Sequence, residues 1–396
     1  MPPVGAEWAE PRLALRWALM ELVDTRSGTR RALEAGPVVR VYVCGITPYD
    51  ATHLGHAFTY VAFDALIRYL EHLGHEVRYV RNVTDVDDDI LRKGRELGEA
   101  PESITKREVD RFTRDLIALH CRPADAEPYA TAYVPAMIRA AETLVADGSA
   151  YALADGRVYF DTGASHCYGT FAKLTRAERL EQFAEKGGDP EAPGKRDALD
   201  FLLWQPSGAG EPSWESPWGP GRPGWHIECS VMAIEELGPT IDIHGGGNDL
   251  EFPHHEAELC QSEHLTGQEF SRFWLHTGMV ALDGVKMSKS LGNLVFVDEL
   301  RERFDPMAVR RYLLQHHYRD GWSYDEAEMV EAASAVKRWT EAAGADGEDP
   351  AAAARFHEAM RSDLDTPMAI AALDAAAEAG AGTTVRELAE VLGFVL

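Results

Sequence analysis

Two apolar runs with a helical segment between them constrain the fold of this 396-residue chain most strongly. Val38–Val43 (VVRVYV) is typical of a buried strand, and the turn-rich loop CGITPYD follows it. His56–Leu73 carries apolar residues at helical spacing, and Val77–Val83 is typical of a second strand. A strand, a loop, a helix and a strand in this order open a parallel α/β sheet. The sequence therefore predicts an α/β fold.

The sheet pattern resumes later in the chain. Thr240–Ile243 is followed by GGGNDL and by a helix expected from about His254. Asp283 and Gly284 lie between apolar residues and predict a hairpin just before Lys286.

The remaining segments suggest how the chain is divided. Residues of about 105–220 contain helical stretches and two loop-like strings, EKGGDPEAPGKRD and SWESPWGPGRPGW, which are typical of an insertion. After Arg301 the chain is helical in pattern and becomes rich in alanine. We therefore expect a catalytic α/β domain over residues 1–300, which contains the insertion, and a C-terminal helical region over residues 301–396.

Composition limits the partners of the protein. The formal net charge is −26, from 65 acidic and 39 basic residues, whereas nucleic-acid binders usually carry a basic surface. A local basic patch remains compatible with this average. The chain lacks an apolar run of about 18 residues, and its first residues lack the order of a signal peptide. We expect a cytoplasmic protein with no membrane partner and, on balance, no nucleic-acid partner.

The five cysteines form no dense framework. In a cytosolic chain such residues are usually buried, catalytic or metal-bound rather than paired, and we expect the same here. Cys44 ends the first strand, Cys229 lies in PGWHIECS, and His254 and Glu258 lie four apart on one helix face. Two thiolates, one imidazole and one carboxylate could form a zinc site, although spacing alone leaves four unrelated residues as an alternative.

Two further motifs carry residues suited to phosphate. His53-Leu54-Gly55-His56 lies where the first helix begins, and a helix N-terminus offers free N–H groups and a positive dipole end. Lys286 and Lys289 lie in KMSKS, where two ammonium groups could neutralise the departing pyrophosphate. Taken alone, either motif is better explained as an ordinary solvated loop.

Together these motifs resemble the cysteinyl-tRNA synthetase superfamily. The matching strings, over roughly residues 38–300, are CGITPYDATHLGHA, NVTDVDD, RPGWHIECS, DIHGGGNDLEFPHHE and KMSKSLGN. The resemblance implies a Rossmann-like sheet of the class I synthetase type, with ATP and Mg²⁺ between the histidine and KMSKS motifs. It also implies one zinc ion per chain that binds the substrate thiolate and so separates cysteine from serine.

The resemblance assigns further positions by their place in the matching strings. His53, His56, Lys286 and Lys289 would act on the phosphates of ATP, and Trp225 would be a wall of the cysteine pocket. Simple core packing is the alternative for Thr59, Val83 and Val280. The positions that would line the cysteinyl-adenylate are Cys44, Gly45, Ile46, Thr47, Thr59, Asn82, Val83, Thr84, Gly247, Asn248, Asp249 and Val280.

Two branches of the superfamily compete for the acceptor of the cysteine. GITPYDATHLGHA, HTGMVALDGVKMSKS, HHYRDGW and DLDTPMA, with the short tail after KMSKS, are similar to the cysteine ligases of mycothiol biosynthesis. That branch implies L-cysteine, ATP and glucosaminyl-inositol as substrates and a monomer without tRNA. PHHEAELCQSE and KMSKSLGN are closer to the tRNA synthetases, so Glu258 could be a fourth zinc ligand or a neighbouring group. A tRNA ligase, a ligase for another small amine and a non-catalytic paralogue remain alternatives.

Overall fold

A four-stranded parallel sheet forms the centre of the protein. The computed structural model describes residues 19–49, 51–287 and 291–396, and the statements below concern these residues. The sheet confirms the predicted α/β fold, and its strands run in the order β10 (Ser271–Thr277), β9 (Ile241–Gly247), β3 (Val38–Ile46) and β4 (Glu76–Val83).

The side chains of β3 divide between two apolar cores, because successive residues of a strand point to opposite faces. Val39, Val41 and Val43 belong to the core covered by α2 (Leu54–His72). Tyr42 and Cys44 belong to the core on the other face, which includes residues of α7 (Trp225–Leu237) and α8 (Glu256–Thr266). The strand therefore directs the thiol of Cys44 towards α7 and α8.

Close packing of α2 on the sheet depends on Gly245 in β9. A β-carbon added at this position would lie 2.0 Å from the ring of Phe63 on α2. Any larger residue at this position would overlap the buried ring. Packing against Phe63 therefore explains why glycine occupies position 245, within the HGGG string.

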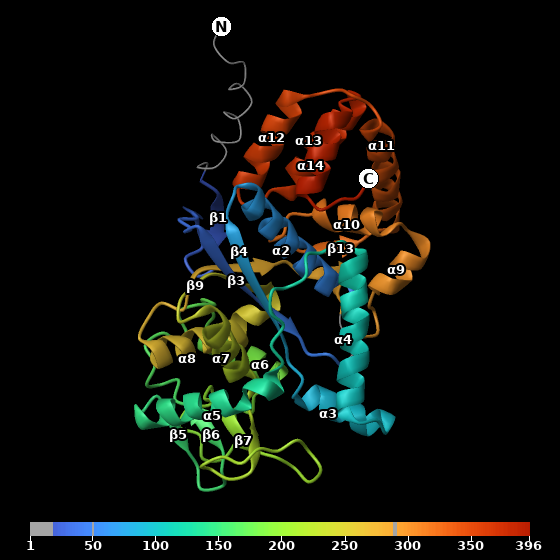
Figure 1. The fold of residues 1–396 in the computed structure, drawn as a ribbon. Helices are drawn as coiled ribbons and strands as arrows, with labels where there is room; N and C mark the ends of the chain where they lie inside the picture. Colours follow the sequence, from blue (N-terminus) through green and yellow to red (C-terminus); the bar gives the residue numbers. More distant parts are fainter. Residues whose placement is uncertain (1–18, 50, 288–290) are drawn as a thin grey trace.

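The chain between β4 and β9 forms the lower part of the molecule in Figure 1. The insertion was predicted to begin near residue 105 and the α/β domain to end at residue 300. These positions fall inside α4 and α9 (Val297–Arg303), and both boundaries stay predictions. The elements of this part are α3 (Asp88–Leu97), α4 (Pro101–Ala118), α5 (Ala130–Ala146), α6 (Arg176–Glu185), α7 and an antiparallel sheet of β5 (Ala150–Ala152), β6 (Val158–Phe160), β7 (Phe201–Pro206) and β8 (Gly221–Pro223).

The predicted hairpin at Asp283 and Gly284 is confirmed. These two residues have φ values of 53° and 75°, the left-handed conformation that a tight hairpin turn requires. They join β11 (Val280–Leu282) to β12 (Val285–Lys286), and β11 also pairs in parallel with β13 (Trp322–Tyr324). A second hairpin near the start of the described chain joins β1 (Glu21–Asp24) to β2 (Thr29–Ala32).

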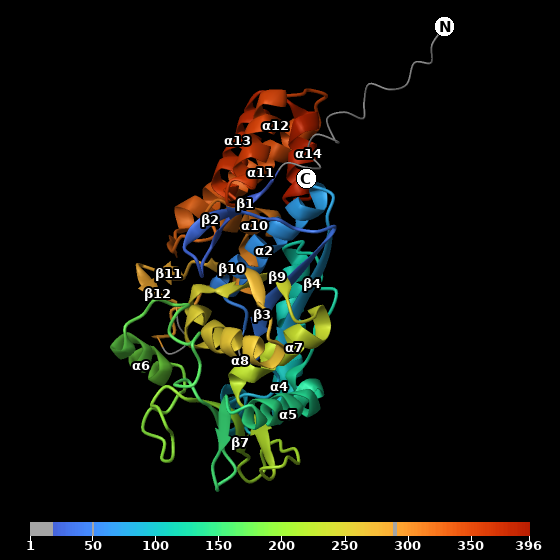
Figure 2. The ribbon, with the colours of Figure 1, turned by 90° about the vertical axis from the view of Figure 1, so that its left-hand side faces the viewer.

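The C-terminal segments are mainly helical, as the sequence predicts, and share the core of α2. Figure 2 shows α11–α14 at one end of the molecule and β7 at the other. Trp339, Phe356 and Leu373 from this end join the same apolar cluster as Leu66 of α2. The helices are α9 (Val297–Arg303), α10 (Pro306–Leu314), α11 (Glu326–Ala343), α12 (Pro350–Arg361), α13 (Thr366–Glu378) and α14 (Gly382–Val391).

A buried ion pair ties α10 to α2. Arg310 is 0% exposed, and its guanidinium donates to the carboxylate of Asp64, which is 3% exposed. Arg310 also donates to the carbonyls of Leu392 and Leu119, each at 2.8 Å. This one guanidinium therefore joins α2, the end of α4 and the C-terminus.

In the described part of the chain, no helix is long and apolar enough to cross a membrane.

We expect Asp64→Ala to lower the free energy of unfolding by about 3–5 kcal/mol, because it leaves a buried guanidinium without its counter-ion. Glu331→Ala, which breaks the exposed pair with Arg338 at 2.8 Å, should cost no more than about 1 kcal/mol. Urea unfolding of both variants measures the difference. Equal, small losses would show that the buried pair does not hold the two regions together.

Candidate metal centre and nucleotide site

The four predicted metal-binding residues meet in one buried cluster. Cys44 comes from the end of β3, Cys229 from α7, His254 from η2 (Glu251–His255) and Glu258 from α8. Their ligand atoms all lie within 4.8 Å of one another. Glu258 Oε1 lies 3.4 Å from Cys44 Sγ and 3.0 Å from His254 Nε2. The structure thus brings together the four residues that spacing alone left unrelated.

Among the described residues, no lysine or arginine forms an ion pair with Glu258 in the cluster. Glu258 is 0% exposed, and its ion-pair partners among the described residues are all histidines. Burial holds the pKa values of His254 and His255 well below the ordinary range, so these two imidazoles are neutral. Burial also raises the pKa values of both Cys44 and Cys229. A bound cation would supply the charge that converts the thiols to thiolates.

Three buried histidines around the cluster were missed as site residues by sequence reasoning. His244 Nε2 lies 2.8 Å from Glu258 Oε2, and His226 Nδ1 lies 2.9 Å from His254 Nδ1. His255 belongs, with His244, Cys44 and Glu258, to a second group that could hold a metal ion. The sequence held no signal for His244 by itself, because its place opposite Tyr42, two residues before Cys44, follows only from the pairing of β9 with β3.

Trp225 lies against one of the predicted ligands. Its ring stacks on that of His254, with centroids 4.2 Å apart and an interplanar angle of 15°. Trp225 begins α7, so the same helix supplies both this indole and Cys229. Its predicted role as a wall of the cysteine pocket stays a prediction.

The predicted phosphate motif lies at the N-terminus of α2. His53 is the N-cap, and its Nδ1 accepts a hydrogen bond from the backbone N–H of Gly55 at 3.1 Å. The rings of His53 and His56 stack with centroids 3.9 Å apart. Both imidazoles therefore lie together at the N-terminus of a 19-residue helix, and the positive end of the helix dipole there is suited to an anion.

The ends of β3 and β4 are joined by a small hydrogen-bond network. Gly45 N donates to Asn82 Oδ1 at 2.7 Å, and Asn82 Nδ2 donates to Thr84 Oγ1 at 3.1 Å. Thr84 N donates to the carbonyl of Ile46 at 3.0 Å. A β-carbon on Gly45 would collide with the backbone of Asn82, so glycine is required for this close approach. Thr47 follows, half-buried, on the same loop.

The other predicted adenylate positions fall into two groups. Thr59, Val83 and Val280 are buried, and Thr59 Oγ1 lies 2.7 Å from Thr277 Oγ1. Gly247 ends β9 and the exposed Asn248 and Asp249 begin η1 (Asn248–Leu250), so they lie at the carboxyl edge of the sheet. All these assignments stay predictions. Lys286 ends β12, while Lys289 lies outside the described residues.

The expectation that all five cysteines are unpaired is wrong for Cys167 and Cys260. These two residues form a disulfide, whereas Cys44, Cys121 and Cys229 are free. The partners are 93 residues apart in the sequence, and pairing of this kind cannot be deduced from spacing. The acidic string after Thr84 begins α3, with Asp87 as its N-cap.

We expect acid to destabilise the fold through His276. Burial lowers the pKa of His276 from 6.5 to about 3, so below pH 6.5 the unfolded chain binds a proton that the folded chain does not. The free energy of unfolding should therefore fall as the pH is lowered. His276→Gln should reduce this slope by up to about 1.4 kcal/mol per pH unit in urea unfolding between pH 6 and pH 4. The exposed His166→Gln is the control, and equal slopes for both variants would contradict the assignment.

Comparisons with known proteins identify the family of the chain. Residues 32–334 match the family described as the tRNA synthetases class I (C) catalytic domain. A Thermomonospora curvata protein named L-cysteine:1D-myo-inositol 2-amino-2-deoxy-alpha-D-glucopyranoside ligase is 47% identical and covers 92% of this chain and 89% of its own length. A Thermobispora bispora protein of the same name is 43% identical, with 96% of each chain covered.

Solved structures show the same fold at low identity. Mycobacterium tuberculosis methionyl-tRNA synthetase in complex with methionyl-adenylate is 18% identical with a TM-score of 0.60, over 90% of this chain and 89% of that one. A leucyl-tRNA synthetase of Agrobacterium radiobacter K84 is 13% identical with a TM-score of 0.61, over 91% of this chain and 83% of that one. The chain therefore belongs to the tRNA synthetase class I (C) catalytic domain family.

Proposed function

We propose that this protein joins L-cysteine to the amine of glucosaminyl-inositol in two steps, with ATP as the energy source. In the first step the cysteine carboxylate attacks the α-phosphorus of ATP, which gives cysteinyl-AMP and pyrophosphate. In the second step the amine attacks the carbonyl carbon of cysteinyl-AMP, which gives the amide and AMP. The observation that carries this proposal is the cluster of Cys44, Cys229, His254 and Glu258 beside the loop that leads to α2.

The proposed metal is zinc, because its preferred ligands are those of the cluster. Two ligand atoms on one tetrahedral zinc, each bound at about 2.0–2.3 Å, lie about 3.3–3.8 Å apart. The cluster has comparable separations of 3.4 Å from Cys44 Sγ and 3.0 Å from His254 Nε2 to Glu258 Oε1. Bound zinc would favour the thiolate of cysteine over the hydroxyl of serine. Cys44, Cys229 and His254 are the proposed ligands, with Glu258 as the fourth ligand or as a neighbouring group.

The protein itself would contribute position and charge to the first step. The N-terminus of α2, with His53 and His56, would bind phosphate oxygens through N–H groups. Lys286 and Lys289 would neutralise the charge that develops on pyrophosphate. Held in this way beside the cysteine carboxylate, the α-phosphorus is placed for attack, and positioning of this kind lowers the barrier without covalent help from the protein.

The relatives and the charge together favour the amino-sugar acceptor over tRNA. Both named relatives are ligases whose names specify L-cysteine and an inositol 2-amino-2-deoxyglucopyranoside. The net charge of −26 opposes the approach of a polyanion. The proposal accordingly includes ATP with Mg²⁺, two further small-molecule substrates, no nucleic-acid or membrane partner, a monomer and a cytoplasmic location.

The test is a transfer assay with purified protein, ATP, Mg²⁺ and labelled L-cysteine. Glucosaminyl-inositol and cysteine-specific tRNA are offered separately as acceptors. We expect label in an amide of the amino sugar, AMP and pyrophosphate in equal amounts, and no label in the tRNA. L-serine in place of cysteine is the control for the proposed role of sulfur, and it should give little ATP–pyrophosphate exchange.

Two outcomes would contradict the proposal in different ways. Transfer of cysteine to tRNA but not to the amino sugar would make the protein a tRNA ligase. No cysteine-dependent ATP–pyrophosphate exchange at all would favour a non-catalytic protein that binds cysteine or ATP.

A further inference from the structure

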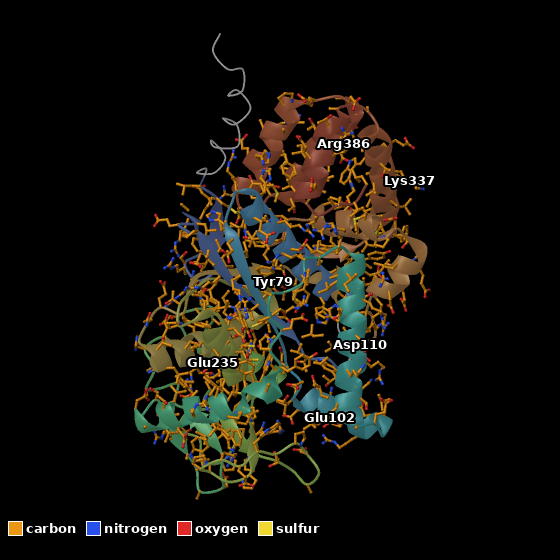
Figure 3. The ribbon with its side chains drawn as sticks, in the orientation of Figure 1. Tyr79, Glu102, Asp110, Glu235, Lys337 and Arg386 are labelled. Carbon is orange, nitrogen blue, oxygen red and sulfur yellow. A yellow bond between two sulfur atoms is a disulfide. The ribbon has the colours of Figure 1, made fainter. Side chains whose placement is uncertain are left out.

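A cavity of about 500 Å³ lies between α3, α4, the start of α5 and the segment around Trp214. Asp87, Thr105, Tyr129 and Trp214 are among the residues that line it. Figure 3 labels Glu102 and Asp110, two further lining residues, on the vertical helix α4. A cavity of this size accommodates a small polar ligand.

The cavity adjoins the carboxyl edge of the central sheet, where ligands of open α/β sheets bind. The segment that contributes Asp87 begins directly after Thr84, whose N–H donates to the carbonyl of Ile46 at the end of β3. Val83, the last residue of β4, also forms an isolated β-bridge with Tyr129, which lines the cavity. The cavity therefore adjoins the carboxyl end of β4, beside the strand that carries Cys44.

The lining is acidic and aromatic. Asp87, Glu102 and Asp110 contribute carboxylates, while the lining cation Lys106 is already paired with Asp110 at 3.1 Å. Trp214 and Tyr129 add rings that can pack against a sugar or attract an ammonium group. This combination fits a cationic, hydroxyl-rich ligand and disfavours a phosphate-rich one.

Two polar groups in the lining can each form a further hydrogen bond. Thr105 is 7% exposed, and its buried hydroxyl has no hydrogen-bond partner in the protein. Asp87 Oδ1 accepts the N–H of Asp89 at 2.8 Å as the cap of α3, while no described residue donates to its other oxygen. Burial raises the pKa of Asp87 to about 6, which leaves the carboxylate charged at neutral pH. A buried hydroxyl without a partner is costly unless a ligand or water satisfies it.

We propose that this cavity binds the acceptor of the second step, a hydroxyl-rich primary amine, with Asp87 holding its ammonium group and Trp214 packing against its ring. The inference rests on the proposed function, since it assigns a place to the acceptor of that reaction. In this arrangement the ammonium group loses a proton to solvent and approaches the adenylate as the free amine from the β4 side of the sheet. Thr105 contributes a hydrogen bond to a hydroxyl of the acceptor.

The test compares Asp87→Asn and Trp214→Ala with the wild-type protein. Asparagine retains the helix cap and removes only the charge. We expect each variant to raise the KM for glucosaminyl-inositol by about tenfold or more. Cysteine-dependent ATP–pyrophosphate exchange should stay within about twofold, which also shows that the variants are folded. Asp88→Asn and Trp218→Ala are matched controls outside the cavity lining. In both, the KM for glucosaminyl-inositol and the rate of ATP–pyrophosphate exchange should stay within about twofold of the wild-type values.

A ligand without the amine separates a binding role of Asp87 from a structural one. Glucosyl-inositol, with a hydroxyl in place of the amine, is used as a competitive inhibitor of the transfer step. In Asp87→Asn its inhibition constant should be unchanged, while the KM for the amine rises, because only the ammonium loses its partner.

Three results are distinguishable. An unchanged KM for the amino sugar in both Asp87→Asn and Trp214→Ala would overturn the cavity assignment while the proposed function stands. An equal loss of both ligands in Asp87→Asn would overturn the ammonium contact and leave a structural role. Failure of the wild-type protein to transfer cysteine to the amino sugar would overturn the proposed function and, with it, this inference.

Discussion

A carboxylate that is cut off from water beside two thiols and a neutral imidazole is the constraint on which the rest of the site depends. Glu258 is 0% exposed and faces Cys44, His244 and His254. An isolated buried negative charge is very costly, and thiols in the same space add to the cost when they ionise. A divalent cation would remove this cost. We therefore propose that a metal ion completes the cluster.

The fold places these groups by simple periodicities. The two-residue period of β3 turns Cys44 towards α7 and α8 while Val43 faces α2. The four-residue spacing of His254 and Glu258 then brings both to the same side as Cys44. The loop after Cys44 leads directly to the N-terminus of α2, so one continuous segment joins the cluster to the proposed phosphate-binding end of this helix.

The sequence was sufficient for elements with strong local patterns and insufficient for contacts that depend on packing. The runs at β3, α2 and β4 and the Asp283-Gly284 turn were predicted within a few residues. Short strands such as β13 carry too little pattern to be found. The roles of His226 and His244 depend on which helices and strands become neighbours. The disulfide between Cys167 and Cys260 and the cavity lined by Asp87 and Trp214 also arise only when distant segments pack together.

X-ray absorption at the zinc edge counts the sulfur atoms around a bound zinc ion, and so tests whether the cluster binds zinc and selects cysteine by its sulfur. We expect the purified protein to hold zinc with two sulfur neighbours, from Cys44 and Cys229. Saturating L-cysteine should add one sulfur at about 2.3 Å, and L-serine should add none. Cys229→Ser should lower the sulfur count by one, while Cys121→Ser, at a free cysteine outside the cluster, should leave it unchanged. If the protein holds no zinc, or if L-cysteine leaves the sulfur count unchanged, zinc does not select the substrate at this cluster.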